Sequence, residues 1–218
     1  LFMPVYVPSL SLIVVKIVSV YPHNSTVLGI PNIHGKLLLI NAADGVPVCM
    51  MDAERLTALR TGAASGLATD ILASADSEIF AVFGTGVQAY AQVQGVLAVR
   101  DIKKVLVYGL DVSEARSFVS SIQQVFNVEA SVAAKEELRQ ADIISTATNS
   151  RIPVFAPGDV KPGCHINAIG SFKPDMQELP EEIIAGSRVF VDQWEACISE
   201  AGDIQIPIQK KLIVPDHI

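Results

Sequence analysis

The sequence lacks the residue clusters that would indicate a disulfide framework or a metal centre. Its 218 residues include three cysteines and four histidines. Cys49, Cys164 and Cys197 are odd in number and far apart, and the histidines show no paired spacing, so we predict no metal site. A reduced, cytoplasmic protein is the simplest interpretation of this cysteine content.

Positive charge is also scarce. The chain has 16 Lys and Arg residues against 23 Asp and Glu residues, a formal net charge of −7. We therefore expect no basic surface that would bind nucleic acid or an anionic membrane. Half of the residues are hydrophobic and 18% are charged, which excludes a disordered chain. The length allows one large domain or two small ones with an ample core.

Residues 1–20 form an almost entirely apolar run, for which a membrane span or a signal peptide is the alternative interpretation. Pro4 and Pro8 would break a helix, and the run is rich in β-branched residues with Lys16 set among them. We therefore predict extended core structure here.

Residues 1–73 favour strands followed by one helix. Asp44-Gly45 is a strong hairpin signal, and Asp52 can cap the helix that follows. The small residues 62–66 at the centre of this helix suit close approach by another backbone or a ligand. The predicted strands are Ile13–Val20, Lys36–Asn41 and Val46–Met51, and the apolar stripe of the helix is Leu56, Leu59, Ala63, Leu67 and Ile71.

From Ser77 onward, strands and helices alternate, which predicts an α/β fold with a doubly wound, mostly parallel sheet of the Rossmann type. Ligands bind such sheets at the carboxyl ends of the strands, here after residues 83, 108, 147 and 169. The predicted strands are Glu78–Phe83, Lys104–Tyr108, Val128–Val132, Ile143–Ala147, His165–Ile169 and Arg188–Val191. The predicted helices are Gln88–Val99, Ser113–Val125 with Ser113 as N-cap, Lys135–Gln140, Pro180–Ala185 and Gln193–Ala201.

A glycine motif marks the first of these strand ends. An apolar strand runs into Gly84-Thr85-Gly86-Val87-Gln88-Ala89 and then into a helical pattern, the order that a dinucleotide-binding βαβ unit requires. Gly84 allows the tight turn, and Gly86 leaves room for a pyrophosphate at the helix N-terminus. Ala89 is small enough for the helix to lie close to the sheet.

Asp111 stands 22 residues after Ala89, near the distance at which an acidic residue binds the adenosine ribose of NAD. It could equally belong to the N-terminal turn ahead of Ser113. No Arg or Lys stands at positions 109–112 to bind a 2′-phosphate. The cofactor is therefore expected to be NAD(H) or NADP(H), with NAD favoured.

Two cations stand in apolar surroundings. Lys16 interrupts a β-branched run, either as an outward-facing or edge-strand lysine, or as a buried cation that awaits an anionic ligand. Arg60 falls inside the apolar stripe of its helix, where its guanidinium could hold a carboxylate in bidentate fashion. A structural arginine that extends its charged end to solvent is the alternative.

Polar residues follow the fourth and fifth predicted parallel strands. One strand ends in Thr146-Ala147-Thr148-Asn149-Ser150, and the next ends in Asn167-Ala168-Ile169-Gly170-Ser171-Phe172. The polar residues of these segments could contact ribose and nicotinamide, although ordinary turn chemistry produces such clusters too. Four acidic residues beyond them are typical of a solvated face and of helix N-terminal charges: Asp175, Glu178, Glu181 and Glu182. No histidine stands where it could activate a cysteine nucleophile.

Together these residues resemble the ornithine cyclodeaminase/μ-crystallin family over nearly the whole chain. The pieces that carry the resemblance are Lys16-Ile17-Val18, Tyr21-Pro22-His23-Asn24, Met51-Asp52, Leu56-Thr57, Arg60-Thr61-Gly62-Ala63, Gly84-Thr85-Gly86, Ala147-Thr148-Asn149-Ser150, Lys161-Pro162-Gly163, Ile166-Asn167-Ala168-Ile169-Gly170, Val189-Phe190-Val191-Asp192 and Glu200-Ala201-Gly202-Asp203.

The resemblance implies a two-domain, usually dimeric, NAD(P)-dependent protein. A substrate-binding and dimerisation domain, incomplete here, would comprise residues 1–74 with 202–218, and a dinucleotide-binding domain residues 75–201. Lys16 and Arg60 match the family's substrate-site lysine and carboxylate-binding arginine. Family members normally begin earlier, with a further substrate-site arginine, and close with a C-terminal helix, so this chain is expected to be truncated at both ends.

Phe172 bears on the reaction, because ornithine cyclodeaminases resemble this chain here but carry an acid/base aspartate at its position. The resemblance therefore implies reduction of a cyclic imine carboxylate to a proline- or pipecolate-like product. The alternatives are a cyclodeaminase or alanine-type dehydrogenase, and a non-catalytic binder of NAD(P)H or a small ligand. The implied substrate residues are Lys16, Arg60, Thr61, Ser171 and Phe172, with Asp175 as an alternative acid. The implied cofactor residues are Gly84, Thr85, Gly86, Val87, Gln88, Asp111, Thr146, Thr148, Asn149, Asn167, Ile169 and Gly170.

Overall fold

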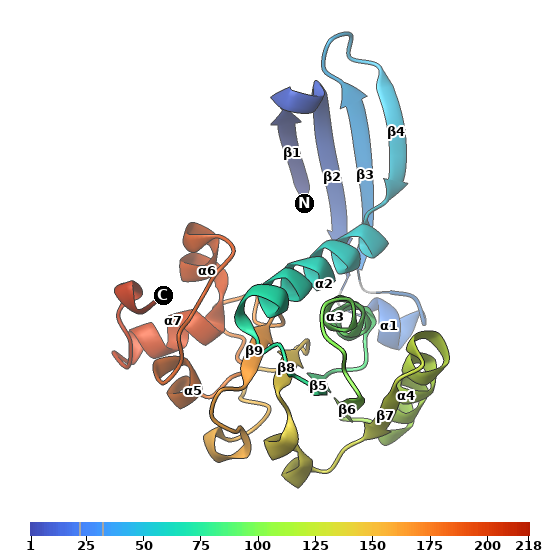
Figure 1. Ribbon diagram of the computed structural model, residues 1–218. Helices are drawn as coiled ribbons and strands as arrows, with labels where there is room; N and C mark the ends of the chain where they lie inside the picture. The colour runs from blue at the N-terminus through green and yellow to red at the C-terminus, as the bar shows by residue number, and fades with distance from the viewer. Residues whose placement is uncertain (22, 32) are drawn as a thin grey trace. The chain divides into compact units, whose positions relative to one another are not determined.

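A computed structural model describes residues 1–21, 23–31 and 33–218 (Figure 1). Pro22, part of one family-like motif, lies outside the described residues. The chain divides into two compact units, Leu1–Arg60 and Thr61–Ile218. Helix α2 (Ala53–Leu72) begins in the first unit and ends in the second. The division that we expect by function, 1–74 with 202–218 against 75–201, stays a prediction, although residues 202–218 lie in the second unit.

The first unit is built on a four-stranded antiparallel sheet of order β1-β2-β3-β4 (Figure 1). The three strands predicted before residue 52 are confirmed, and the turn between β3 and β4 contains Gly45, whose φ of 78° suits glycine. The elements are β1 (Phe2–Val7), η1 (Pro8–Leu10), β2 (Leu12–Val20), α1 (Asn24–Val27), β3 (Ile33–Asn41) and β4 (Pro47–Asp52).

The apolar N-terminal run is extended, as predicted, but its expected place in a core is wrong. No residue of 1–20 is buried, and Gly35, Ala53 and Ala58 are the buried residues among those described in this unit. Both faces of β1 and β2 carry apolar side chains, and one helix start cannot cover two faces of a sheet. Over the described residues, no helix is both long and apolar enough to cross a membrane.

The second unit contains a five-stranded parallel sheet of order β7-β6-β5-β8-β9, which confirms the doubly wound α/β fold (Figure 1). The order reverses between β5 and β8, so the ends of these two strands form the switch point where ligands bind. The strands are β5 (Ile79–Phe83), β6 (Lys104–Tyr108), β7 (Glu129–Val132), β8 (Ile143–Thr146) and β9 (His165–Ala168).

The helices and turns of the second unit cover both faces of this sheet. Phe80 and Val82 pack under α3 and α4 on one face, while Ala81 and Phe83 pack on the other face against residues from η2, α5 and α7. The elements are α3 (Val87–Leu97), α4 (Val112–Phe126), η2 (Lys135–Gln140), η3 (Pro157–Asp159), α5 (Glu181–Ala185), α6 (Trp194–Glu200), α7 (Gly202–Gln209) and η4 (Pro215–His217).

The strand predicted at 188–191 is wrong, because this segment pairs with no strand. It lies in the loop between α5 and α6, and its side chains make their contacts without a sheet. Val189 packs against the core cluster that contains Ala81 and Phe83, and the Arg188 guanidinium lies 5.4 Å from the centre of the Phe190 ring.

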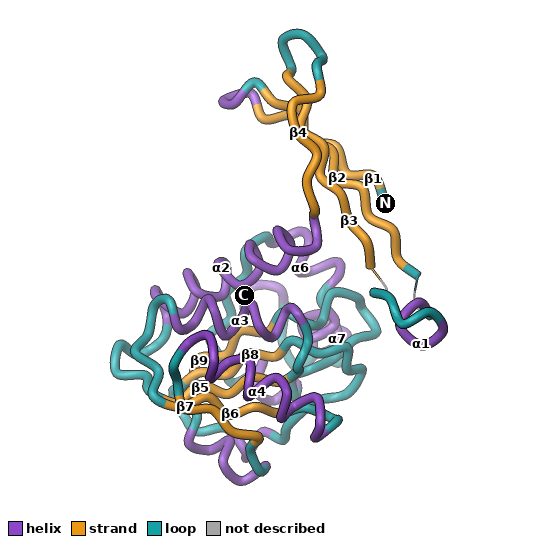
Figure 2. The backbone as a smooth tube through the Cα atoms, turned by 90° about the vertical axis from the view of Figure 1, so that its right-hand side faces the viewer, coloured by secondary structure: helices purple, strands orange, loops and turns teal. Residues whose placement is uncertain are grey.

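Helix α2 packs through its small residues. Figures 1 and 2 show it beside α3, and a Cβ added at Gly62 would lie 2.2 Å from the Ala91 carbonyl oxygen. A Cβ at Gly95 would in turn lie 2.0 Å from the Gly62 carbonyl oxygen. The small residues at the centre of α2 thus allow the backbone of α3 to approach closely. The apolar stripe faces outward instead, and Leu67 is 62% exposed.

Candidate functional site

The glycine motif forms the tight turn between β5 and α3. Gly84 adopts φ 107°, and a Cβ there would lie 2.6 Å from the Ala147 carbonyl oxygen, so both conformation and space demand glycine. Gly86 is the N-cap of α3, and a Cβ there would meet nothing within 4 Å. Ala89 is fully buried. The turn is therefore closed on its sheet side and open at the helix N-terminus.

This open helix start fits a pyrophosphate. The first hydrogen bond of α3 runs from the Tyr90 amide to the Gly86 carbonyl at 3.0 Å. The amides of Val87, Gln88 and Ala89 therefore have no carbonyl acceptor within the helix. Amides in this position, together with the helix dipole, bind anions. The structural context that the motif requires, a strand before it and a helix after it, is present.

Asp111 caps α4, and the predicted N-cap, Ser113, is wrong. The Asp111 Oδ1 atom accepts hydrogen bonds from the Ser113 amide (2.7 Å), the Glu114 amide (3.0 Å) and the Ser113 hydroxyl (2.7 Å). The hydroxyl first, and then the two amides, lower the pKa of Asp111 from its ordinary value. The Thr85 hydroxyl donates to Glu114 at 3.4 Å. Two carboxylates thus stand beside the glycine loop, while contact of Asp111 with a ribose stays a prediction.

The predicted residues after β8 and β9 differ in what their side chains do. The Asn167 amide is buried and donates to the Thr69 hydroxyl at 3.0 Å, while its oxygen lies 3.0 Å from His165 Nε2. It is thus occupied inside the protein. Thr146 Oγ1 is buried and has no hydrogen-bond partner among the described residues, and Asn149 is exposed. Cofactor contact by these three residues stays a prediction.

Glu178 contradicts the prediction of a solvated acidic face, because its side chain is fully buried. It accepts hydrogen bonds from Thr148 and Gly170, two of the predicted cofactor residues. Asp203, also buried, accepts from the amides of Glu178 and Leu179. Sequence reasoning missed both carboxylates as parts of the site.

The predicted substrate residues after β9 differ in their exposure and in their hydrogen bonds. The Ser171 hydroxyl donates to the Met176 carbonyl at 2.9 Å and accepts from the Asp203 amide at 3.0 Å, so it shapes the loop. Phe172 is 54% exposed. Asp175 is exposed and pairs with Arg151 at 3.2 Å, which places the alternative acid in a surface ion pair.

The fold of the first unit brings Lys16 and Arg60 together. Lys16 lies on the central strand β2, opposite Met3 and Leu37, and these cross-strand partners share one face of the sheet. Gly35 is on the same face, and a Cβ there would lie 3.0 Å from the Ala53 Cβ, so α2 begins on the face that carries Lys16. Two turns later this helix presents Arg60.

The two cations interact electrostatically. Burial first, and then the positive charge of Arg60, lower the pKa of Lys16 from its usual value of 10.5. Among the described residues, no carboxylate lies within ion-pairing distance of either side chain. Two neighbouring cations without an acidic partner favour an anionic ligand, and a guanidinium suits a carboxylate in particular. Thr61, the next residue, is the first of the second unit and half-buried.

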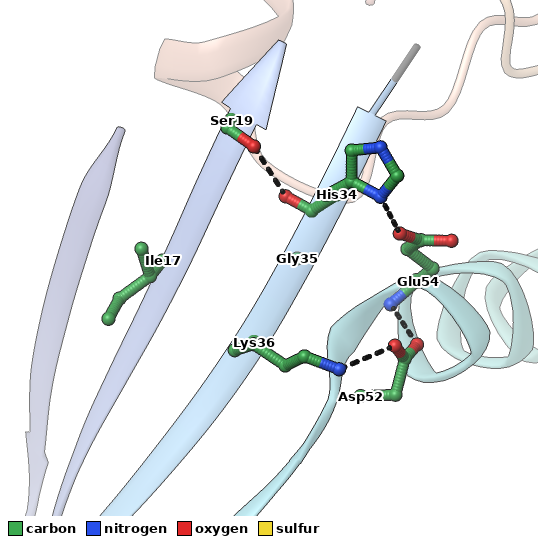
Figure 3. Close-up of a pocket in the computed structure, with 7 residues that line it drawn as sticks. All are labelled: Ile17, Ser19, His34, Gly35, Lys36, Asp52 and Glu54. Carbon is green, nitrogen blue, oxygen red and sulfur yellow. Dashed lines mark hydrogen bonds and ion pairs between the residues drawn. The ribbon is translucent and has the colours of Figure 1, made fainter. Parts of the chain in front are cut away.

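A pocket on the other face of this sheet has a different character (Figure 3). Its ionisable side chains are paired, His34 with Glu54 at 3.4 Å and Lys36 with Asp52 at 3.2 Å. Asp52 also accepts from the Glu54 amide at 2.9 Å, which confirms the predicted cap of α2. An incoming anion would meet opposed charges here, unlike at Lys16.

Over the described residues, no group of three His, Cys, Asp or Glu side chains could hold a metal ion. All three cysteines are free thiols, and burial raises the pKa of Cys164 to about 12.

Comparison with known proteins matches residues 1–217 to the sequence model of the ornithine cyclodeaminase/mu-crystallin family. A Delta(1)-pyrroline-2-carboxylate reductase of Bacillus cereus is 41% identical over 221 residues, covering 100% of this chain and 67% of the relative. The Delta(1)-pyrroline-2-carboxylate reductase of Thermococcus litoralis, solved with NADH and L-proline, has a TM-score of 0.88 at 35% identity, covering 100% of this chain and 72% of that one. An archaeal alanine dehydrogenase dimer with bound NAD has a TM-score of 0.90 at 34% identity, covering 100% and 66%. The chain thus spans about two thirds of the length of these relatives.

Proposed function

Because the chain belongs to the ornithine cyclodeaminase/mu-crystallin family, we propose that it is an NAD(P)H-dependent reductase of cyclic imine carboxylates. The substrates would be of the pyrroline-2-carboxylate or piperideine-2-carboxylate type, and the products proline- or pipecolate-like imino acids. The observation that carries the proposal is the pair of Lys16 and Arg60, which interact with each other and have no acidic partner among the described residues. Relatives that are named for pyrroline-2-carboxylate reduction support it.

The two cations have separate tasks in this reaction. Arg60 binds the substrate carboxylate through the paired N–H groups of its guanidinium. Lys16 places its ammonium at the imine nitrogen and donates the proton that the product amine gains. Because burial and Arg60 lower the pKa of Lys16, its ammonium is a stronger acid than an exposed lysine. Reduced nicotinamide, when bound, supplies the hydride that the imine carbon accepts.

The second unit would hold the dinucleotide. The amides at the start of α3 bind the pyrophosphate, and Gly86 leaves its approach open. NAD(H) is favoured over NADP(H), because the Asp111 and Glu114 carboxylates beside the loop would repel a 2′-phosphate. Replacing Asp111 with serine should then improve the KM for NADPH relative to that for NADH.

We further propose a homodimer, which would cover the apolar surface of the first unit. Large apolar side chains are exposed along β1 and along α2, among them Phe2 at 76% and Leu59 at 53% exposure. The mass of the purified protein measured by light scattering tests this, and a monomer at micromolar concentration would contradict it. Free thiols and a reduced cofactor fit a cytoplasmic location.

Turnover tests the reductase directly. The purified protein is incubated with NADH or NADPH and each cyclic imine carboxylate, and the loss of nicotinamide absorbance is followed. Arg60→Lys keeps the charge but loses the two-pronged contact, so we expect the KM for the imine to rise by about tenfold or more. Arg55→Lys is the matched control, an exposed arginine on the same helix. Lys16→Met should lower kcat instead.

Three results would contradict the proposal. Ammonia release from ornithine without imine reduction would indicate a cyclodeaminase, against the evidence of Phe172. NADH oxidation with pyruvate and ammonia alone would indicate an alanine-type dehydrogenase. Ligand binding without turnover of any imine would indicate a non-catalytic binder.

A further inference from the structure

Two buried carboxylates stand behind the loops that follow β8 and β9. The Glu178 side chain is fully buried and Asp203 is 4% exposed. Neither has an ion-pair partner among the described residues, so the hydrogen bonds that the two carboxylates accept come from neutral donors alone. A buried carboxylate destabilises the folded protein unless it accepts good hydrogen bonds, and apolar residues at these positions would give a more stable core. Their arrangement therefore calls for a reason beyond packing.

Glu178 joins two loops that are distant in sequence. Its Oε1 atom accepts from the amide and from the hydroxyl of Thr148, each at 2.6 Å. Its Oε2 atom accepts from the Gly170 amide at 2.8 Å. The first donors lie in the loop after β8 and the last in the loop after β9, so one carboxylate fixes the spacing between the two loops.

The backbone is shaped to admit this carboxylate. A Cβ at Gly170 would lie 2.4 Å from Glu178 Oε2 and 2.4 Å from the Thr148 carbonyl oxygen. The φ of Gly170 is not positive, so close approach is what requires glycine here. Gly202 is similar, since its Cβ would lie 1.9 Å from the Met176 carbonyl oxygen.

Asp203 holds the segment that carries Glu178. Its Oδ1 atom accepts from the Glu178 amide at 2.8 Å and from the Leu179 amide at 3.0 Å. Its own amide donates to the Ser171 hydroxyl at 3.0 Å, in the loop after β9. The first turn of α7 thus fixes both the Glu178 backbone and the far side of this loop.

The position of the loops after β8 and β9 indicates what the hydrogen bonds of Glu178 and Asp203 do. In this strand order the loop after β6, with Asp111, lies on the adenosine side of the switch point, and the loops after β8 and β9 lie on the other side. We propose that Glu178 is a positioning residue that shapes the nicotinamide half of the dinucleotide site by fixing Thr148 against Gly170, with Asp203 holding Glu178 in place. This rests on the dinucleotide site of the proposed function.

Binding of two ligands that differ at the nicotinamide end tests the role. Dissociation constants are measured by titration calorimetry for NADH and for ADP-ribose, which has the adenosine half but no nicotinamide. In Glu178→Gln an amide NH₂ must face either Thr148 or Gly170, so one donor loses its acceptor. We expect the Kd for NADH to rise about tenfold while that for ADP-ribose changes less than about twofold. The matched control is Glu182→Gln, the same change at an exposed position, which should alter neither.

A milder variant keeps the test decisive if Glu178→Gln does not fold. Thr148→Val removes one of the three donors and preserves shape, so the Kd for NADH should rise about threefold and that for ADP-ribose should not. Equal losses for both ligands, or no loss for either, would overturn the positioning role. Failure of the unaltered protein to bind either ligand would refute the dinucleotide site itself, a result distinct from the first two.

Discussion

The Asp203 carboxylate makes the stability of the folded protein depend on pH. Its pKa is raised from 3.8 to about 6, chiefly by burial and to a lesser degree by the charge of Glu178, while two backbone hydrogen bonds lower it. Oδ1 accepts both of those bonds, whereas Oδ2 is buried and has no hydrogen-bond partner among the described residues. The ionised form is therefore less stable inside the protein than in the unfolded chain.

The size and sign of the effect follow from these pKa values. The folded state holds its proton up to a higher pH than the unfolded state, so stability is greatest below pH 4 and falls as pH rises through 6. One pKa unit corresponds to about 1.4 kcal/mol, so the full loss is about 3 kcal/mol. Between pH 5 and pH 7.5 the linkage relation gives a loss of about 1.4 kcal/mol.

Asp203→Asn removes the titration and keeps an oxygen for the two amides. We expect its free energy of unfolding, relative to the unaltered protein, to rise by about 1.4 kcal/mol between pH 5 and pH 7.5. Urea unfolding followed by circular dichroism at both pH values measures this difference. Any constant cost of the new amide group cancels in the comparison. Asp76→Asn, an exposed position in the same unit, is the control.

The reasoning would be refuted if the free energies of unfolding of Asp203→Asn and the unaltered protein differed by an amount that stays constant within about 0.5 kcal/mol over this range. Such a result would show that Asp203 has the same pKa in the folded and unfolded states. A change of opposite sign would mean that hydrogen bonding outweighs burial.

Three further predictions concern other parts of the fold. Gly62→Ala should lower the free energy of unfolding by about 2 kcal/mol or more in urea unfolding, because the new Cβ would lie 2.2 Å from the Ala91 carbonyl oxygen; an unchanged value would show that α2 and α3 separate easily. Asp111→Ala removes the N-cap of α4 and should cost about 1 kcal/mol, while Asp111→Ser should restore most of it; equal losses would deny the cap. Iodoacetamide at pH 8 should alkylate exposed Cys49 much faster than Cys164, whose pKa is about 12, as peptide mass spectrometry would show; equal rates would contradict the burial of Cys164.

The parallel sheet of the second unit was predictable because its signals are local. Five of its strands lie within one residue of prediction, since short apolar runs alternate with helical patterns and turn residues. The sixth predicted strand, 188–191, has the same apolar character. Its failure has a nonlocal cause, because Val189 is partly buried against the core cluster that contains Ala81 and Phe83 and needs no strand partner.

In the first unit, local signals predicted the strands but not what packs against them. Its strands and hairpin were predicted correctly, but the prediction that residues 1–20 lie in a core was wrong, and the apolar stripe of α2 is exposed. Apolar periodicity says which side chains share a face, and it does not say what lies against that face. In α2 the small residues approach a neighbouring backbone, and so the large ones are turned outward.

Lys16 in the first unit and Glu178 in the second show why one charged group was predictable from sequence and another was not. Lys16 is conspicuous because a cation in a β-branched strand conflicts with its immediate neighbours. Glu178 sits among Asp175, Glu181 and other polar residues, where a carboxylate conflicts with nothing nearby in sequence. Its burial is created by donors from loops far from it in sequence. The available signal was Gly170, a glycine just past a strand without a positive φ, because such a glycine marks a place where another group must approach the backbone.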